Sequence, residues 1–110
     1  MATIDLFSNQ TQNASSNAFK VNGGQINTAN RKSYLEINGV LDNASIVLEN
    51  KDPAGAWHST GREDEIKLIT NTPGVLPIDY SDELELRVVI SGVGASTSLS
   101  IWVKNAKEVI

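Results

Sequence analysis

Side chains that could take part in catalysis are few in this chain of 110 residues, which has a single histidine, His58, and no cysteine. A zinc site would need carboxylates for its remaining ligands, which is uncommon because zinc is usually bound by histidine and cysteine. A serine triad would have to use His58, yet the sequence has no Gly-x-Ser-x-Gly turn to present the serine. Thiol chemistry is excluded, and His58 is expected to be a surface histidine.

Neighbouring carboxylates are the remaining candidates for general acid–base chemistry or for calcium binding. The pairs 64–65 and 82–83 are acidic, and Asp42, Asn43 and Asp79 offer further oxygen ligands. All of them fall at expected turns and strand ends, where solubility alone places polar residues, and none has the spacing of a calcium-binding loop. The sequence therefore predicts no catalytic residue, no cofactor and no metal ligand.

The overall charge also narrows the classes of partner. Thirteen acidic and nine basic residues give a net charge of −4, and residues 31–32 are the only adjacent basic pair. This balance argues against nucleic acid and against an anionic membrane surface. No apolar run approaches the roughly 20 residues of a membrane span. The first residues lack the basic and apolar segments of a signal peptide, so we expect synthesis in a cytoplasm.

The clearest structural signal lies in residues 83–91, Glu-Leu-Glu-Leu-Arg-Val-Val-Ile-Ser, where apolar side chains occupy every second position. Such alternation is typical of a strand with one buried and one solvated face. Residues 98–104 repeat the pattern with Leu99, Ile101 and Val103. The connection 92–97 consists of small residues, so we expect the two strands to pair as a hairpin at the centre of a two-layer fold.

The rest of the chain continues in short strands separated by turn signals. Further strands are expected at 3–7, 18–21, 33–38, 44–49, 57–60 and 65–69. Residues 75–78 contain Pro77, so they form either a strand at a sheet edge or no strand. About eight short strands with turns every eight to twelve residues predict one all-β domain, an antiparallel β-sandwich or jelly roll. We expect that domain at 18–110, preceded at 1–17 by an N-terminal strand or arm and a polar linker. This strand could pair with its own sheet or with a neighbouring copy.

A candidate interface follows from apolar side chains that the alternation does not place in the core. Trp102 is out of register with Leu99, Ile101 and Val103, and Val89 is out of register on its own strand. Exposed aromatic residues often mark binding faces. We therefore take Ile4, Leu6, Trp57, Val89 and Trp102 as candidate interface residues. The alternative is that a loop or the N-terminal segment covers the apolar face.

Four stretches carry a resemblance to a known group of proteins. Residues 18–24 contain Phe-Lys-Val-Asn-Gly-Gly, 35–39 and 44–49 form a strand–Gly–strand unit, a polar turn precedes Trp57, and 86–92 read Leu-Arg-Val-Val-Ile-Ser-Gly. In this order they are similar to small virion proteins of tailed bacteriophages, whose motifs are Phe-x-Val-x-Gly-Gly and Leu-Arg-x-x-hydrophobic-Ser-Gly. The turn before Trp57 departs from the group, with Asp-Pro-Ala-Gly in place of Asp-Gly.

The resemblance implies a non-enzymatic structural protein of the virion, a decoration or cement protein on the outer surface of the capsid. The implied partner is the major capsid protein, and the implied state is a homo-oligomer such as a trimer, assembled in the host cytoplasm. Each copy would bury surface against several capsid subunits, so that the summed contacts would resist expansion of the shell by mass action.

Two other classes of function stay open at this point. One is a tail-associated or host-surface module that binds glycans, which would need aromatic residues gathered on one face. Tyr34, Trp57, Tyr80 and Trp102 are too dispersed in the sequence to show such a face. The other is a small hydrolase, which would need two carboxylates about 5 to 10 Å apart in a cleft.

Overall fold

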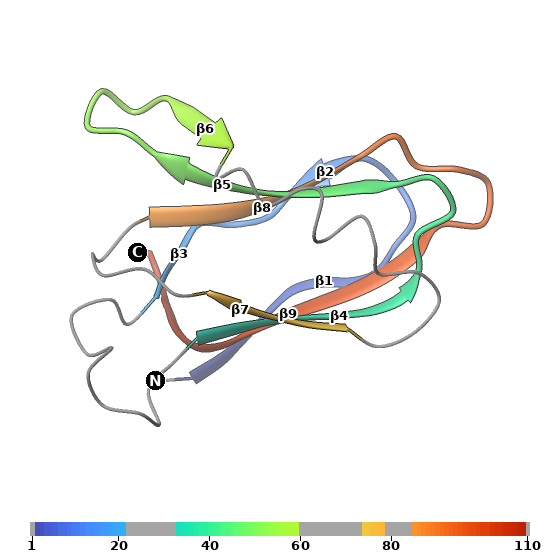
Figure 1. Ribbon diagram of the computed structural model, residues 1–110, viewed down its shortest axis with the longest axis horizontal. Helices are drawn as coiled ribbons and strands as arrows, with labels where there is room; N and C mark the ends of the chain where they lie inside the picture. Colours follow the sequence, from blue (N-terminus) through green and yellow to red (C-terminus); the bar gives the residue numbers. More distant parts are fainter. Residues whose placement is uncertain (1, 22–32, 60–73, 79–84, 110) are drawn as a thin grey trace.

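The computed structural model describes residues 2–21, 33–59, 74–78 and 85–109, and the described part of the chain contains strands and no helix. The strands form two antiparallel sheets that face each other (Figure 1). The predicted all-β class is therefore confirmed, and the arrangement is a β-sandwich. The strands of the described residues are β1 (Ala2–Gln10), β2 (Ala14–Ser15), β3 (Phe19–Val21), β4 (Ser33–Val40), β5 (Ser45–Lys51), β6 (Trp57–Ser59), β7 (Gly74–Ile78), β8 (Glu85–Ser91) and β9 (Ser98–Glu108).

The first sheet has the order β6-β5-β8, with β2 also paired to β8. The second sheet has the order β9-β4-β7, with β1 also paired to β9. The short strand β3 pairs with both β8 and β9 and so joins the two sheets along one side (Figure 1). Residues 74–78 form a strand, β7, and within the described chain it pairs only with β4, as an edge strand would.

The predicted hairpin between the two strongest strands is wrong. β8 pairs with β2, β3 and β5, whereas β9 pairs with β1, β3 and β4, so the two lie in opposite sheets. Alternation marks which face of a strand is apolar but does not identify its hydrogen-bonding neighbour. In opposite sheets the two apolar faces can cover each other. The six residues 92–97 can span the roughly 10 Å between packed sheets.

Two of the connections that cross between the sheets lie at the same end of the sandwich and hold each other in place (Figure 1). Residues 41–44 lead from β4 to β5, and residues 92–97 lead from β8 to β9. The buried hydroxyl of Thr97 donates a hydrogen bond to the Leu41 carbonyl at 2.7 Å and accepts one from the Gly94 N–H at 2.9 Å. We call this group of contacts the crossover end.

The carboxylate of Asp42 completes the crossover end by accepting a hydrogen bond from the Ser96 N–H at 2.7 Å. Asp42 and Asn43 both have positive φ, at 44° and 74°, and the turn is closed by a hydrogen bond from the Ala44 N–H to the Leu41 carbonyl at 3.0 Å. Aspartate and asparagine tolerate such φ values better than most residues. These two residues, considered above as calcium ligands, thus shape a turn.

The N-terminal segment is a strand of its own sandwich. β1 pairs with β9 from Ala2 to Gln10, with three register shifts, and Phe7 is buried in the core. Part of the expected polar linker is also strand, because β1 runs to Gln10 and β2 pairs with β8. Strand pairing uses backbone groups, so a stretch of Ser, Asn and Gln can join a sheet edge without apolar side chains.

Side chains from both sheets meet in one hydrophobic core. Phe19, on the joining strand β3, is fully buried, and each large apolar side chain removed from water contributes about 1.5 to 3 kcal/mol. Ile4, Leu6, Ala14 and Val93 pack against the core without being fully buried. The buried apolar residues are Phe7, Phe19, Leu35, Ile37, Leu41, Ala44, Ile46, Leu48, Ile78, Leu86, Val88, Ile90, Leu99, Ile101, Val103 and Ala106. The strand expected at 65–69 lies outside the described residues.

Candidate functional site

The structure does not bring the five candidate interface residues together. Trp57 and Val89 lie on the outer face of the first sheet, while Trp102 lies on the outer face of the second. Ile4 and Leu6 pack against the core, so their apolar area stabilises the fold. The remaining candidate residues lie on two separate surfaces, one on the outer face of each sheet.

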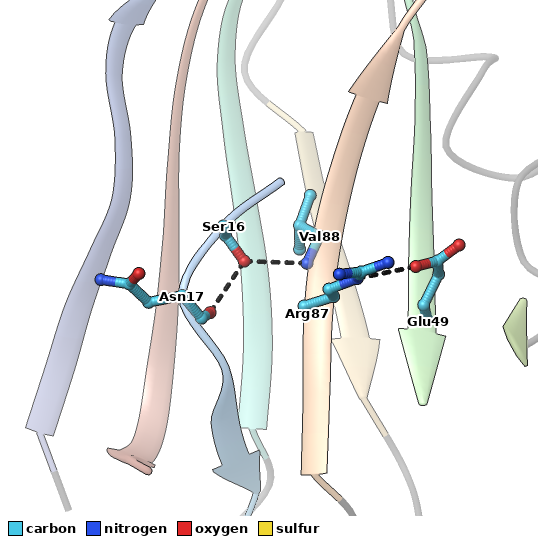
Figure 2. A network of polar contacts seen from close by, with 5 residues as sticks. All are labelled: Ser16, Asn17, Glu49, Arg87 and Val88. Atoms are coloured by element: carbon cyan, nitrogen blue, oxygen red, sulfur yellow. Dashed lines mark hydrogen bonds and ion pairs between the residues drawn. The ribbon is translucent and has the colours of Figure 1, made fainter. Parts of the chain in front are cut away.

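The outer face of the first sheet carries a group of paired charges around Trp57. The Arg87 side chain donates from Nε to Oε1 of Glu49 at 2.8 Å, and its guanidinium carbon lies 4.5 Å from the centre of the Trp57 ring (Figure 2 shows the Arg87–Glu49 pair). Lys51 Nζ lies 5.9 Å from the same ring and 3.4 Å from Glu85. We call these five residues the Trp57 face.

Strand register accounts for this arrangement. Glu49 is the cross-strand partner of Arg87, and Lys51 is the partner of Trp57. Because Leu48 and Leu86 point into the core, the alternate residues on these strands point outward. The sequence predicted Trp57 but not Arg87 or Glu49 as members of the face. Outward charges were visible in the alternation, but their partners depend on the pairing of β5 with β8.

The turn between β5 and β6 is fixed by Asp52. Its carboxylate accepts a hydrogen bond from the Ala56 N–H at 2.9 Å and lies 2.7 Å from Nε2 of His58. The backbone adds hydrogen bonds from the Asp52 N–H to the Ala56 carbonyl and from the Gly55 N–H to the Asp52 carbonyl. The side chain of His58 is 59% exposed, as expected for a surface histidine. The hydrogen bond with His58 and then that from Ala56 hold the pKa of Asp52 below its ordinary value.

A pH-dependent contribution to stability follows from Asp52. Because its pKa is lower in the folded than in the unfolded chain, its stabilising effect is present above about pH 4 and is lost as the pH falls through the lowered value. We expect Asp52→Asn to lower the melting temperature at pH 6, with the difference from the parent narrowing toward pH 2. Thermal unfolding of both proteins from pH 2 to 7 measures this. A difference that is constant over that range would contradict it.

Ser16 is hydrogen-bonded to the backbone of β8, the strand that carries Arg87 (Figure 2). Its hydroxyl accepts a hydrogen bond from the Val88 N–H at 2.9 Å and donates one to the Asn17 carbonyl at 2.9 Å. The Ser16 N–H also donates to the Val88 carbonyl at 2.8 Å. These contacts bind the segment after β2 to β8, so the serine has a structural role.

The outer face of the second sheet carries a hollow of about 440 Å³. It lies at the end of the described pairing of β4 with β9, where the last cross-strand pair is Tyr34 with Lys104 and the next residue, Asn105, has a positive φ of 58°. Across it the Lys104 ammonium pairs with the Glu36 carboxylate at 2.8 Å. The lining residues are Thr3, Tyr34, Glu36, Val75, Lys104 and Asn105.

The remaining candidates for chemistry are not assembled into a site by the described residues. Asp42 is engaged in the crossover end through its hydrogen bond from Ser96. The acidic pairs 64–65 and 82–83, together with Asp79 and Tyr80, lie outside the described residues. Within the ranges that the structure describes, no group of three or more His, Asp or Glu side chains is placed to hold a metal ion.

The described surface thus offers two features, the Trp57 face and the hollow, on opposite sides of the sandwich. Among the described residues, no helix has the length and apolar character that crossing a membrane requires. Comparisons of this chain with protein-family models, with curated proteins and with solved structures find no match.

Proposed function

We propose that this chain is a non-enzymatic structural protein of a tailed-phage virion, a decoration protein that binds the outer surface of the capsid. The sequence resemblance supports this proposal, because its motifs fall on strands that belong to one sandwich. The described parts of 18–24, 35–39, 44–49 and 86–92 lie largely on β3, β4, β5 and β8. The motifs that carry the resemblance are therefore parts of one folded unit in this chain.

The observation that carries the proposal is the contact between Arg87 and Trp57 on the outer face of the first sheet. Tryptophan and arginine are the residue types enriched among those that dominate protein–protein binding energy. Arg87 is already held between the Trp57 ring and Glu49, so docking would cost little further side-chain entropy. A sheet face with such pre-positioned side chains suits contact with another protein surface.

In the proposed mechanism the protein binds the capsid and catalyses no reaction. Each copy docks through the Trp57 face onto capsid subunits, and a ligand that prefers the assembled, expanded shell stabilises that state by mass action. If copies associate with one another on the shell, several weak contacts act together and raise the effective affinity. The major capsid protein is the proposed partner, and the virion is the proposed location.

The test is binding to expanded phage capsids prepared from a genome in which the gene for this chain is deleted. Purified protein is expected to bind saturably and to raise the temperature at which the capsids disassemble. Trp57→Ala and Arg87→Ala are each expected to weaken binding by about tenfold or more. Trp102→Ala, an equal loss of aromatic area on the opposite sheet, is the matched control and should bind as the parent does.

One outcome would contradict the decoration role, and another would contradict only the assignment of the Trp57 face as the docking surface. Failure of the folded protein to bind any capsid form would remove the decoration role. Saturable binding that is lost in Trp102→Ala and kept in Trp57→Ala would retain the role and move the contact to the second sheet. Electron microscopy of decorated capsids would show which face is docked and how many copies meet at each site.

A further inference from the structure

The hollow on the second sheet combines one aromatic ring with a pair of opposite charges. Tyr34 and Glu36 alternate with the buried Leu35 and Ile37 on β4, so both side chains point outward. Lys104 is the cross-strand partner of Tyr34 and reaches Glu36 at 2.8 Å. The ring, the carboxylate and the ammonium are therefore neighbours on two paired strands of one sheet.

The charges in the hollow favour a ligand without net charge. Glu36 and Lys104 neutralise each other, so neither an anion nor a cation would find an unbalanced partner there. An ammonium has three donor hydrogens and a carboxylate has two acceptor oxygens, so a single pairing leaves hydrogen-bonding capacity on both groups. A ligand with hydroxyl groups on adjacent carbon atoms is complementary to such a pair, because a hydroxyl group can both donate and accept a hydrogen bond.

The remaining lining residues define the apolar part of the hollow. Val75 is 59% exposed and is the cross-strand partner of Glu36, so it presents an aliphatic surface beside the charge pair. The Tyr34 ring supplies an aromatic surface with a polar end. At about 440 Å³ the hollow is within the usual range for sites that bind small molecules, roughly 300 to 1,000 Å³.

We propose that this hollow is a saccharide-binding site for a neutral pyranose ring. A pyranose has an apolar face of C–H groups, which packs on Tyr34 and Val75, and a rim of hydroxyl groups, which hydrogen-bond to Glu36 and Lys104. Thr3, on β1, adds a hydroxyl group at the border of the site. The site lies on the opposite side of the sandwich from the Trp57 face, so a capsid-bound copy presents it to solvent. Its exposure on a capsid-bound copy rests on the proposed function, whereas saccharide binding by the free chain is tested separately.

The test is a titration of the ¹⁵N-labelled full chain with the methyl glycosides of glucose, galactose, mannose and N-acetylglucosamine, observed by NMR. At least one glycoside is expected to shift the amide signals of Tyr34, Glu36 and Lys104 saturably, with a dissociation constant in the millimolar range. Tyr34→Ala is expected to weaken that binding about tenfold, and Tyr34→Phe, which keeps the ring, should stay close to the parent. Trp57→Ala is the matched aromatic control and should leave the affinity unchanged.

The substitution Glu36→Gln keeps the shape of the hollow but removes the negative charge that pairs with the Lys104 ammonium. It is expected to weaken binding of the neutral glycoside, whereas Glu49→Gln, an equivalent change on the first sheet, should have no effect. N-acetylneuraminic acid serves as the charged probe and should bind more weakly than the best neutral glycoside. The proposal is overturned if no neutral glycoside shifts these amides, if the charged sugar binds better, or if both Tyr34→Ala and Glu36→Gln bind like the parent.

Discussion

Deletion of residues 2–10 is expected to prevent folding of the chain as a monomer. These residues form β1, which pairs along β9 from Ala2↔Ala106 to Gln10↔Leu99. The deletion removes the buried Phe7 ring, and loss of one buried aromatic side chain costs about 3 to 5 kcal/mol. It also removes Ile4 and Leu6 from the border of the core and opens the edge of β9. Together these losses approach the whole stability of a domain, about 5 to 15 kcal/mol.

Circular dichroism, thermal unfolding and light scattering of the truncated protein measure this effect. We expect no cooperative transition and a tendency to aggregate, because an unpaired strand edge is a template for association. A synthetic peptide of residues 1–11 added during refolding should restore the transition. Ser8→Ala, at an exposed position of the same strand, is the control and should change stability by less than about 0.5 kcal/mol.

The same experiment distinguishes a strand within one chain from an arm exchanged between chains. If the truncated protein melts like the parent and loses only self-association, the N-terminal segment acts on a neighbouring copy. The sequence could not decide this, because Ile4 and Leu6 show the same alternation whichever sheet they join. The structure pairs the segment with its own β9.

Strand positions could be predicted because they depend on local alternation. Residues 85–90 and 98–103 are strands in the structure, with the expected side chains, such as Val88 and Ile101, in the core. Strand partners could not be predicted, because alternation is equally satisfied by a hairpin and by two strands facing each other across a core. The error at 92–97 is of this kind, since a short connection of small residues fits both arrangements.

The two surface features differ in how much of them the sequence could reveal. Trp57 was recognisable as a large aromatic residue beside a polar turn. The contact of Arg87 with that ring requires two pairings, β6 with β5 and β5 with β8, and no local pattern encodes them. The hollow is lined by side chains from β1, β4, β7 and β9, and no local pattern in the sequence encodes that grouping. Contacts that depend on the pairing of several strands could therefore not be predicted from the sequence.

Gly39 illustrates how a correct local signal can be assigned to the wrong element. The dipeptide Asn-Gly at 38–39 is typical of a turn, but β4 continues to Val40 and the turn follows at Asp42 and Asn43. Gly39 has a φ of 119°, which side-chain-bearing residues rarely adopt. It is paired with Leu99, and a Cβ atom at this position would overlap the Ser98 carbonyl oxygen. The glycine is needed for close approach of two strands.

Gly39→Ala is therefore expected to be severely destabilising, by about 4 kcal/mol, because backbone strain and overlap with a backbone atom act together. Urea unfolding followed by tryptophan fluorescence measures the change. Gly55→Ala is the matched control: its φ of 91° is also positive, but the nearest atom to an added Cβ is the end of the Lys51 side chain at 3.8 Å. The Gly55→Ala variant has backbone strain but no overlap with a backbone atom, so its free energy of unfolding should fall by only about 1 to 2 kcal/mol.

Equal losses of stability in the two variants would show that backbone strain dominates and that β4 can move away from Ser98. A larger loss at Gly39 would show that the crossover end holds β4 and β9 at a fixed separation, because relaxation there would have to break the hydrogen bonds from Thr97 to Leu41 and from Ser96 to Asp42.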